Sequence, residues 1–331
     1  MPSVSVVIPV YRVEPYMARC ARSLFKQSLE DIEYIFIDDC SPDHSIDIMK
    51  AVLEEEFPAR KPQVRVFRMP QNSGQAQVRM QGISLATGDY VIQCDSDDEV
   101  DADAYRLMYQ KAIDEDLDIV TSDFRLLGLK NPRIQSQASE PGREIADILS
   151  GKVWGSVCCR LIRKELLNDM ITPKADMWED VVFSVFATSK AMRIGHVAKP
   201  LYYYHRRNSS ICFSGGLANA ISRSESIAAN VSIVLDYLSG VPNVIMAPSD
   251  VVSFKYRARD PLLPYVHLKE YYHKWLNTFP EVDSSLIKAK GISLETKFWF
   301  ILIHLHLYHP WKTVTGCGRK CFARLLSKQE N

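Results

Sequence analysis

The chain has 331 residues, of which 47% are hydrophobic and 24% charged, a size that suits one large domain or a catalytic domain with an appendage. Forty basic residues balance forty acidic ones, so the net charge gives no support to nucleic-acid binding, which favours a basic chain. Eight scattered cysteines, and a strand pattern that begins at Val4, indicate a reduced, cytoplasmic protein without a targeting segment or a disulfide framework.

The amino-terminal part alternates between apolar runs and amphipathic stretches. Strands are predicted at residues 4–10, 32–37, 64–68 and 90–94, where apolar and β-branched residues run together. Apolar residues at helical spacing predict helices between these strands, the third at about 75–86. Strands that alternate with helices favour a mainly parallel sheet with helices on both faces.

The pattern loosens after a fifth predicted strand. A fifth strand is predicted at 118–122, a surface loop at 128–142, and a helix at 181–191 that an acidic pair opens. Beyond about residue 213 the pattern is helical, with a turn-rich break near 240–249. We therefore expect an α/β domain followed by a mainly helical region.

Acidic side chains follow the fourth predicted strand, where Asp95, Asp97 and Asp98 lie within four residues. Ligands of open α/β sheets bind beyond the carboxyl ends of the strands, and Tyr11 and the pair at 38–39 are expected at the same edge. A hard divalent cation such as Mg2+ or Mn2+ relieves the repulsion between clustered carboxylates, and Mg2+ is usually shared with a phosphate-bearing ligand. The alternative is a solvated acidic loop that begins the next helix.

Taken in order, several segments resemble the family 2 glycosyltransferases, which share the nucleotide-sugar-binding α/β fold called GT-A. These segments are VSVVIPVYR at 4–12 with Glu14, IDDCSPD at 37–43, NSG at 72–74 with Arg79, DSDD at 95–98 and WED at 178–180. Cys40 stands where a glycine is commoner, and Met80 where an asparagine often follows the arginine. The resemblance covers residues 3–211 and implies a GT-A catalytic domain at 1–212 and a mainly helical region at 213–331.

The resemblance implies an inverting, metal-dependent hexosyltransferase. It would move a sugar from a nucleoside-diphosphate sugar, with a UDP-sugar expected, to a glycan or lipid-linked acceptor of a cell-surface polysaccharide such as a capsule, lipopolysaccharide or exopolysaccharide. Asp95 and Asp97 would hold Mn2+ or Mg2+, a Lewis acid for the leaving diphosphate. The nucleotide-sugar pocket is then expected to include Pro9, Tyr11, Glu14, Asp38, Asp39, Arg79, Asp95, Ser96 and Arg206.

Several of these residues have plainer alternatives. Asp38 and Asp39 could instead cap the next helix, as acidic residues do. Tyr11 and Glu14 could simply hold the turn after the first strand. Arg79 is expected to reach the base or the diphosphate as a charge-assisted donor, or else to lie on a helix surface.

The acceptor needs a general base, because a sugar hydroxyl stays protonated at neutral pH. By the resemblance Asp180 takes this proton and Glu179 orients the acceptor, while Trp178 offers an apolar platform for a sugar ring. The alternative is an acidic pair that only stabilises the start of the helix. His205 is a candidate third metal ligand, although a histidine beside aromatic residues is often structural, and Arg206 is a candidate phosphate contact.

The carboxyl-terminal residues suggest a surface contact. Residues 298–308 (FWFILIHLHLY) are strongly apolar, but a helix needs about twenty such residues to span a bilayer. Basic residues follow at 312, 319, 320, 324 and 328, so the segment 292–331 suits peripheral contact with anionic lipid at the inner face of the plasma membrane. A core helix with a solvated tail, or a contact in a homo-oligomer, fits the same pattern.

Two other functions suit an α/β scaffold with clustered acids. A nucleotidyltransferase would favour a glycine-rich basic signature near the first strand, and none follows Val10. A catalytically silent glycan-binding protein would be expected to have lost Asp97 or Asp180, and both are present. The sequence also has neither a P-loop run nor a dinucleotide-binding glycine run.

Overall fold

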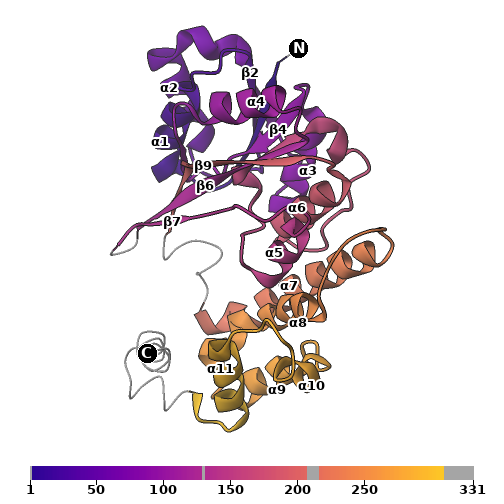
Figure 1. Cartoon of the computed structure of the whole chain (residues 1–331). Coiled ribbons are helices and arrows are strands. Elements are labelled where there is room, and N and C mark those ends of the chain that lie inside the picture. Colours follow the sequence, from indigo (N-terminus) through magenta and orange to yellow (C-terminus); the bar gives the residue numbers. More distant parts are fainter. Residues whose placement is uncertain (1, 129–130, 207–215, 309–331) are drawn as a thin grey trace.

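A twisted sheet with helices around it forms the upper part of the computed structural model, and a group of helices lies below it (Figure 1). The structure describes residues 2–128, 131–206 and 216–308. An α/β part followed by a helical region agrees with the sequence prediction.

The first half of the sheet is parallel. Its strands are hydrogen-bonded in the order β3-β2-β1-β4. The bounds of these strands and of the helices between them are β1 Val4–Val10, α1 Glu14–Phe25, β2 Ile32–Asp38, α2 Ser45–Glu56, β3 Val64–Arg68, α3 Gln75–Leu85 and β4 Tyr90–Gln93, with a 3₁₀ helix at Pro58–Gln63. The four predicted strands agree with these bounds to within one residue. The sequence marks β1, β2 and β4 clearly because each is almost wholly buried, which requires a continuous apolar run.

The second half of the sheet is mixed. Strand β8 pairs antiparallel with both β4 and β6, while β9 runs parallel to β6. The elements of this half are β5 Glu99–Val100, α4 Ala104–Asp114, β6 Ile119–Leu127, β7 Arg133–Gln135, α5 Glu144–Ser150, β8 Arg160–Arg163, α6 Glu179–Lys190 and β9 Ile194–His205, with 3₁₀ helices at Val157–Cys159 and Lys164–Leu167. The parallel pairing expected from the alternation therefore holds from β3 to β4 and for β6 with β9.

Two local predictions were wrong in this half. Strand β6 continues to Leu127, beyond the predicted 118–122, and the short strand β7 lies inside the segment predicted as a loop. The polar residues Thr121, Ser122 and Asp123 are buried in β6, and the register with β9 shifts at Ser122 and Asp123. Buried polar residues and a shifted register interrupt the apolar pattern from which a strand is recognised.

The helical region packs onto the α/β part. Its helices are α7 Gly216–Ser239, α8 Pro248–Arg257, α9 Lys269–Asn277, α10 Val282–Leu286 and α11 Leu294–His304, with a 3₁₀ helix at Asp260–Tyr265. The predicted break near 240–249 falls between α7 and α8. One apolar cluster joins Leu149 of α5 and Val182 of α6 to Val231 of α7 and Phe254 of α8. The two parts thus share a core, and the division at residues 212–213 stays a prediction.

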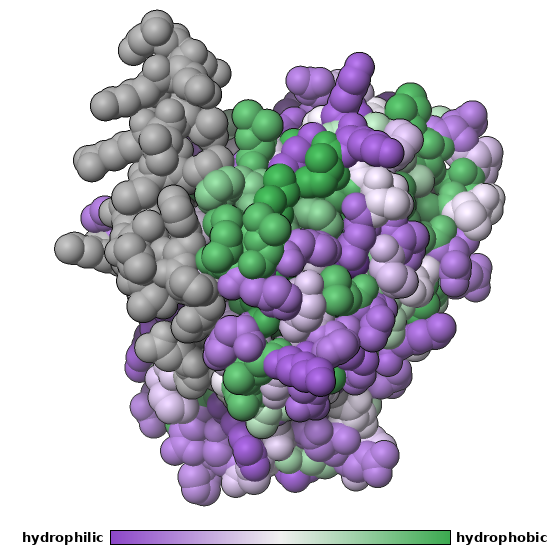
Figure 2. Space-filling model, turned by 90° about the horizontal axis from the view of Figure 1, so that it is seen from below, coloured by the Kyte–Doolittle hydropathy of each residue, from purple (hydrophilic) through white to green (hydrophobic). Residues whose placement is uncertain are grey.

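Helix α11 has a buried face and an exposed apolar face. Phe300 and Ile303 pack in the core of the helical region, whereas Leu294, Ile301 and the following Leu305 are 63%, 44% and 59% exposed. Figure 2 views the molecule from below and shows apolar residues gathered on this side. Among the described residues, no helix has the length and apolar character needed to cross a bilayer. The basic residues predicted to contact lipid, from 312 onward, lie outside the described residues.

Candidate active site

The carboxyl ends of β1, β2 and β4 lie next to one another because β1 pairs with both of the other strands. Val10, at the end of β1, is in register with Asp38 at the end of β2. Tyr11 follows β1, and Asp95 follows β4 after one residue. The edge of the sheet therefore gathers the segments that the sequence predicted would meet there.

Three carboxylates lie together after β4. Asp95, Asp97 and Asp98 each offer an oxygen, and these oxygens lie within 4.8 Å of one another. The Asp98 N–H donates to the carbonyl oxygen of Asp95 over 3.1 Å, so the chain turns back on itself here. Hard divalent cations prefer carboxylate oxygens, and the residues present therefore fit Mn2+ or Mg2+.

Strand β9 holds Asp98 in place. The Tyr202 hydroxyl donates to Oδ2 of Asp98 and the backbone N–H of His205 donates to Oδ1, each over 2.7 Å. Burial raises the pKa of Asp98 to about 7, and the neighbouring Asp95 charge acts in the same direction. Sequence reasoning placed Asp98 in the motif without assigning it to the metal, because these contacts come from more than a hundred residues away.

His205, predicted as the third metal ligand, is not part of the carboxylate group. Its Nε2 lies 2.7 Å from Oε1 of Glu99 in β5, and its role as a metal ligand stays a prediction. The exposed Arg206 is the last described residue before the gap at 207–215. Its backbone N–H donates to the Leu127 carbonyl over 3.2 Å, and its role as a phosphate contact stays a prediction.

Arg79 is buried beneath the site and connects its two halves. From α3, its guanidinium donates to Oδ1 of Asp95 over 2.6 Å and to Oε1 of Glu179 over 3.1 Å. A third bond of 2.7 Å goes to the Gln93 side chain. With an exposed fraction of 2%, Arg79 is not the helix-surface arginine of the alternative reading. All three guanidinium nitrogens bond protein acceptors, so Arg79 holds the carboxylates of Asp95 and Glu179 in position. Its contact with the nucleotide stays a prediction.

Glu179 and Asp180 form the first turn of α6. Glu179 is 5% exposed and faces Arg79, whereas Asp180 is half-buried and its Oδ1 accepts the Val181 N–H over 2.8 Å. Burial raises the pKa of both carboxyl groups, and the Asp180 charge raises that of Glu179 further while Arg79 opposes the shift. A carboxylate with a raised pKa is a stronger base than a free aspartate, and this suits proton abstraction.

Trp178 precedes this pair in a left-handed conformation, with φ of 66°. Its ring stacks on Phe254 of α8 at 5.6 Å between centroids, and the Arg257 guanidinium lies 4.8 Å from the ring centre. The ring is therefore packed against the helical region, and its use as a sugar platform stays a prediction. Sequence reasoning missed this because Phe254 lies beyond the segment that carries the resemblance.

Asp39 fixes the turn before α3. Its Oδ1 accepts the Ser73 N–H over 2.7 Å, and its Oδ2 accepts the Gly74 N–H over 3.1 Å. The alternative was that Asp39 caps α2. Its carboxylate instead accepts from the NSG turn, which precedes α3. The two sequence motifs are parts of one hydrogen-bonded unit.

Asp38 and Cys40 shape the end of β2. The buried Asp38 accepts the Ser41 N–H over 2.8 Å, and Arg68 lies 3.4 Å from its other oxygen. Cys40 has φ of 55°, a left-handed conformation that glycine adopts most easily, which explains why a glycine is commoner here. Base reading by Asp38 stays a prediction.

The remaining predicted residues lie around the same edge. Tyr11 is 38% exposed, with Arg12 packed 5.3 Å from its ring centre. Glu14 accepts the His44 N–H over 3.0 Å and so holds the turn, as its alternative reading had it. Pro9 is half-buried in β1, and Ser96 is buried in the segment 94–98 between β4 and β5, which we call the acidic loop. Contact with a nucleotide stays a prediction for all four.

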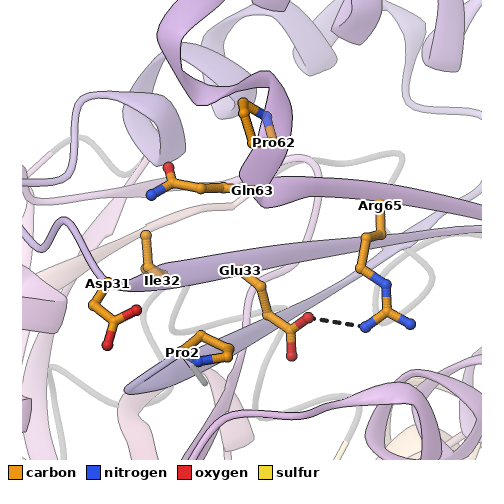
Figure 3. A pocket seen from close by; sticks show the side chains of 7 residues that line it. All are labelled: Pro2, Asp31, Ile32, Glu33, Pro62, Gln63 and Arg65. Carbon is orange, nitrogen blue, oxygen red and sulfur yellow. Dashed lines mark hydrogen bonds and ion pairs between the residues drawn. The ribbon is translucent and has the colours of Figure 1, made fainter.

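A shallow hollow of about 310 Å³ lies elsewhere, at the amino ends of the strands (Figure 3). It is lined by Pro2, Asp31, Ile32, Glu33, Pro62, Gln63 and Arg65. Glu33 pairs with Arg65 there over 2.9 Å and also accepts from Ser5 and Thr87. The hollow lies at the opposite ends of the strands from the carboxylates that follow β4 and is separate from them.

Known proteins resemble this chain over the segments described above. A model of the family described as Glycosyl transferase family 2 matches residues 5–171. Glycosyltransferase GlyG of Streptococcus pneumoniae is 26% identical over 222 residues, which are 63% of this chain and 72% of GlyG. A poly(ribitol-phosphate) beta-glucosyltransferase of Bacillus spizizenii is 30% identical over 61% of this chain and 32% of its own length.

A solved structure shares the fold over almost the whole chain. The crystal structure of residues 1–349 of Staphylococcus aureus TarS in complex with UDP-GlcNAc superposes with a TM-score of 0.68 at 18% identity. It covers 97% of this chain and 92% of that one, so the helical region has a counterpart as well. The predicted GT-A fold with a helical carboxyl-terminal region is thereby confirmed.

Proposed function

Because this chain belongs to glycosyltransferase family 2, we propose that it is an inverting glycosyltransferase that moves a sugar from a nucleoside-diphosphate sugar to a glycan or lipid-linked acceptor. The buried guanidinium of Arg79 is the observation that supports this most directly. It bonds Asp95 on one side and Glu179 on the other. One side chain thus joins the carboxylates proposed for the donor to those proposed for the acceptor.

The donor side is formed by the acidic loop. Mn2+ or Mg2+ held by Asp95, Asp97 and Asp98 would neutralise the charge that develops on the leaving diphosphate. Arg79 orients Asp95, while Tyr202 orients Asp98 through its hydroxyl. These carboxylates are therefore already held in place, which lowers the entropy that donor binding would cost.

The acceptor side is formed by the start of α6. We assign the general base to Asp180, which takes the proton of the attacking hydroxyl, and the orienting role to Glu179. The acceptor oxygen forms a bond to the anomeric carbon as the bond from that carbon to the diphosphate breaks. The electron pair of the breaking bond leaves with the nucleoside diphosphate. Attack from the opposite face inverts the anomeric carbon.

The relatives support a UDP-sugar and a cell-surface polymer. The TarS fragment was crystallised with UDP-GlcNAc, and the Bacillus relative is named for glucosyl transfer to poly(ribitol phosphate). A cytoplasmic site of action, at the inner face of the plasma membrane where a lipid-linked acceptor would lie, belongs to the same proposal.

A panel of nucleotide sugars tests the function. The protein is incubated with UDP-, GDP- and dTDP-sugars and Mn2+, and release of nucleoside diphosphate is measured. One donor class should react, and EDTA should stop the reaction. Release of pyrophosphate instead of a nucleoside diphosphate would indicate a nucleotidyltransferase, and no release from any donor would contradict the proposal.

Two variants separate the proposed roles. Asp97→Ala should remove the Mn2+ dependence of UDP binding in calorimetry; unchanged affinity with Mn2+ present would exclude Asp97 from the metal site. Asp180→Asn should bind UDP as the parent does and lower turnover by at least about 100-fold. Turnover at the parental rate would mean that another group is the base.

The exposed face of α11 is proposed as the lipid contact. Leu294, Ile301 and Leu305 are exposed, and Lys297 lies on the same helix, which suits a helix in the plane of an anionic membrane surface. Deleting residues 292–331 would also remove the core residues Phe300 and Ile303, so substitutions are the better test.

The double variant Ile301→Glu with Leu305→Glu should lose sedimentation with phosphatidylglycerol vesicles. Met192→Glu is the control, because Met192 is an 89% exposed apolar residue of the α/β part. If the double variant binds vesicles normally and instead has a lower mass by light scattering, the face is a contact between copies of the chain.

A further inference from the structure

The loop that leads into Glu179 and Asp180 is bonded to the helical region through one side chain. Asn230, in the middle of α7, is 1% exposed. Its Oδ1 accepts the Lys174 N–H over 2.9 Å, and its Nδ2 donates to the carbonyl oxygens of Ala175 and Met177, each over 2.8 Å. All three bonds go to the backbone of residues 174–177, which we call the acceptor loop.

Both N–H donors of the Asn230 side chain are occupied. A primary amide has two donors, and both are taken by carbonyl oxygens of the acceptor loop. Asparagine is a poor residue for a helix interior, and a buried amide without partners is strongly destabilising. The position is therefore suited to binding a backbone segment and to little else.

The α/β part binds the same loop from its other side. Oδ1 of Asp176 accepts the Ala76 N–H at the start of α3 over 3.0 Å. Ala175 and Met177, the residues on either side of Asp176, are those whose carbonyl groups bond Asn230. The loop is thus held between α3 and α7, and it continues directly into Trp178 and the acidic pair.

We propose that Asn230, acting with Asp176, is a positioning residue that sets where Asp180 meets the acceptor hydroxyl. This rests on the proposed function, because Asp180 is the base only if the chain is a glycosyltransferase. Asn230 touches no reacting group, and its effect passes through the acceptor loop. The helical region then contributes to the geometry of proton transfer as well as to the fold.

The expected effect is on turnover and not on donor binding. The donor carboxylates follow β4 and are held by Arg79 and β9, none of which Asn230 touches. A displacement of about 1 Å at a reacting group lowers the rate by about 100-fold. Loss of Asn230 should therefore lower kcat by about 10- to 100-fold while leaving the KM of the donor within a factor of about two.

The test compares variants of α7 and of the loop in the full chain. Asn230→Asp keeps the shape and the acceptor but turns an oxygen toward two carbonyl groups, and Asn230→Ala removes all three bonds. Ser224→Ala is the matched control, since Ser224 is buried in the same helix and donates to Ala258 over 2.8 Å without touching the loop. Asp176→Ala removes the bond from the exposed Asp176 to the Ala76 N–H of α3. This variant tests the proposal even if the Asn230 variants do not fold.

The readouts are release of nucleoside diphosphate from the most active donor of the panel, UDP binding with Mn2+, and hydrogen exchange of a peptide covering 172–180. Faster exchange and lower kcat in the Asn230 or Asp176 variants, with Ser224→Ala active and UDP affinity unchanged, supports the proposal. Parental kcat in these variants, or an equal loss in Ser224→Ala, overturns it. A parent that releases nothing from any donor instead rejects the proposed function.

Discussion

Replacing Arg79 by methionine tests the buried link between the donor and acceptor carboxylates. Arg79→Met keeps an unbranched apolar side chain in the core but removes the donors to Asp95, Glu179 and Gln93. Two carboxylates and an amide then lose their partner at one point in the interior. The variant should be less stable and less active.

The size of the loss follows from the surroundings of each partner. Breaking a buried ion pair by removing one member costs about 3–5 kcal/mol, because it leaves an uncompensated charge. The Asp95 side chain is 29% exposed and can be solvated, whereas that of Glu179 is 6% exposed and cannot. Glu179 can take up a proton, since burial already raises its pKa. We therefore expect Arg79→Met to lower the free energy of unfolding by about 3 kcal/mol near neutral pH, the lower end of this range.

The pH dependence has a definite sign. Removing the cation raises the pKa of Glu179 in the folded state further above its unfolded value. The protonated glutamic acid is tolerated below that pKa, and the buried charge must form as the pH rises through it. Arg79→Met should therefore lose more stability relative to the parent at alkaline pH than at mildly acidic pH.

Urea denaturation followed by circular dichroism measures the effect, with Arg65→Met as the control. Arg65 also pairs with a buried glutamate, but Glu33 keeps hydrogen bonds from Ser5 and Thr87 when the arginine is lost. The control should lose about 1 kcal/mol or less. A loss in Arg79→Met no larger than in Arg65→Met, or a loss that does not change with pH, would refute the argument.

Two further predictions concern the same site. Burial raises the pKa of Asp180, and only its carboxylate form can accept a proton. As the pH is lowered, kcat should therefore begin to fall at a pH above the ordinary aspartate pKa of about 4. A kcat that stays constant down to about pH 4 contradicts the assignment of Asp180 as the base. Gly74→Ala should lower the free energy of unfolding by more than Gly142→Ala. Both glycines have positive φ, 83° and 79°, but an added Cβ at Gly74 meets the Asp176 carboxylate and one at Gly142 meets open space. Equal losses in urea denaturation would show that Asp176 moves aside freely.

The sequence alone determined the parallel half of the fold and the place of the site. Strands β1, β2 and β4 are almost wholly buried, so each needed a continuous apolar run that can be recognised without neighbours. The polar residues at their carboxyl ends then had to meet at one edge, which is why Asp38 and Asp95 were placed there correctly. The resemblance marked Cys40 as standing where a glycine is commoner, and the structure supplies the physical reason, a positive φ.

Tertiary structure alone decided how the site is held together. Arg79 bonds residues that follow it by 14, 16 and 100 positions, and Asn230 bonds a loop more than fifty residues before it. No periodicity or local motif records such partners, because a hydrogen bond depends on where two atoms lie and not on the spacing of their residues along the chain. For the same reason the contacts of Trp178 with Phe254 and of His205 with Glu99 were not foreseen, because only folding brings those residues together.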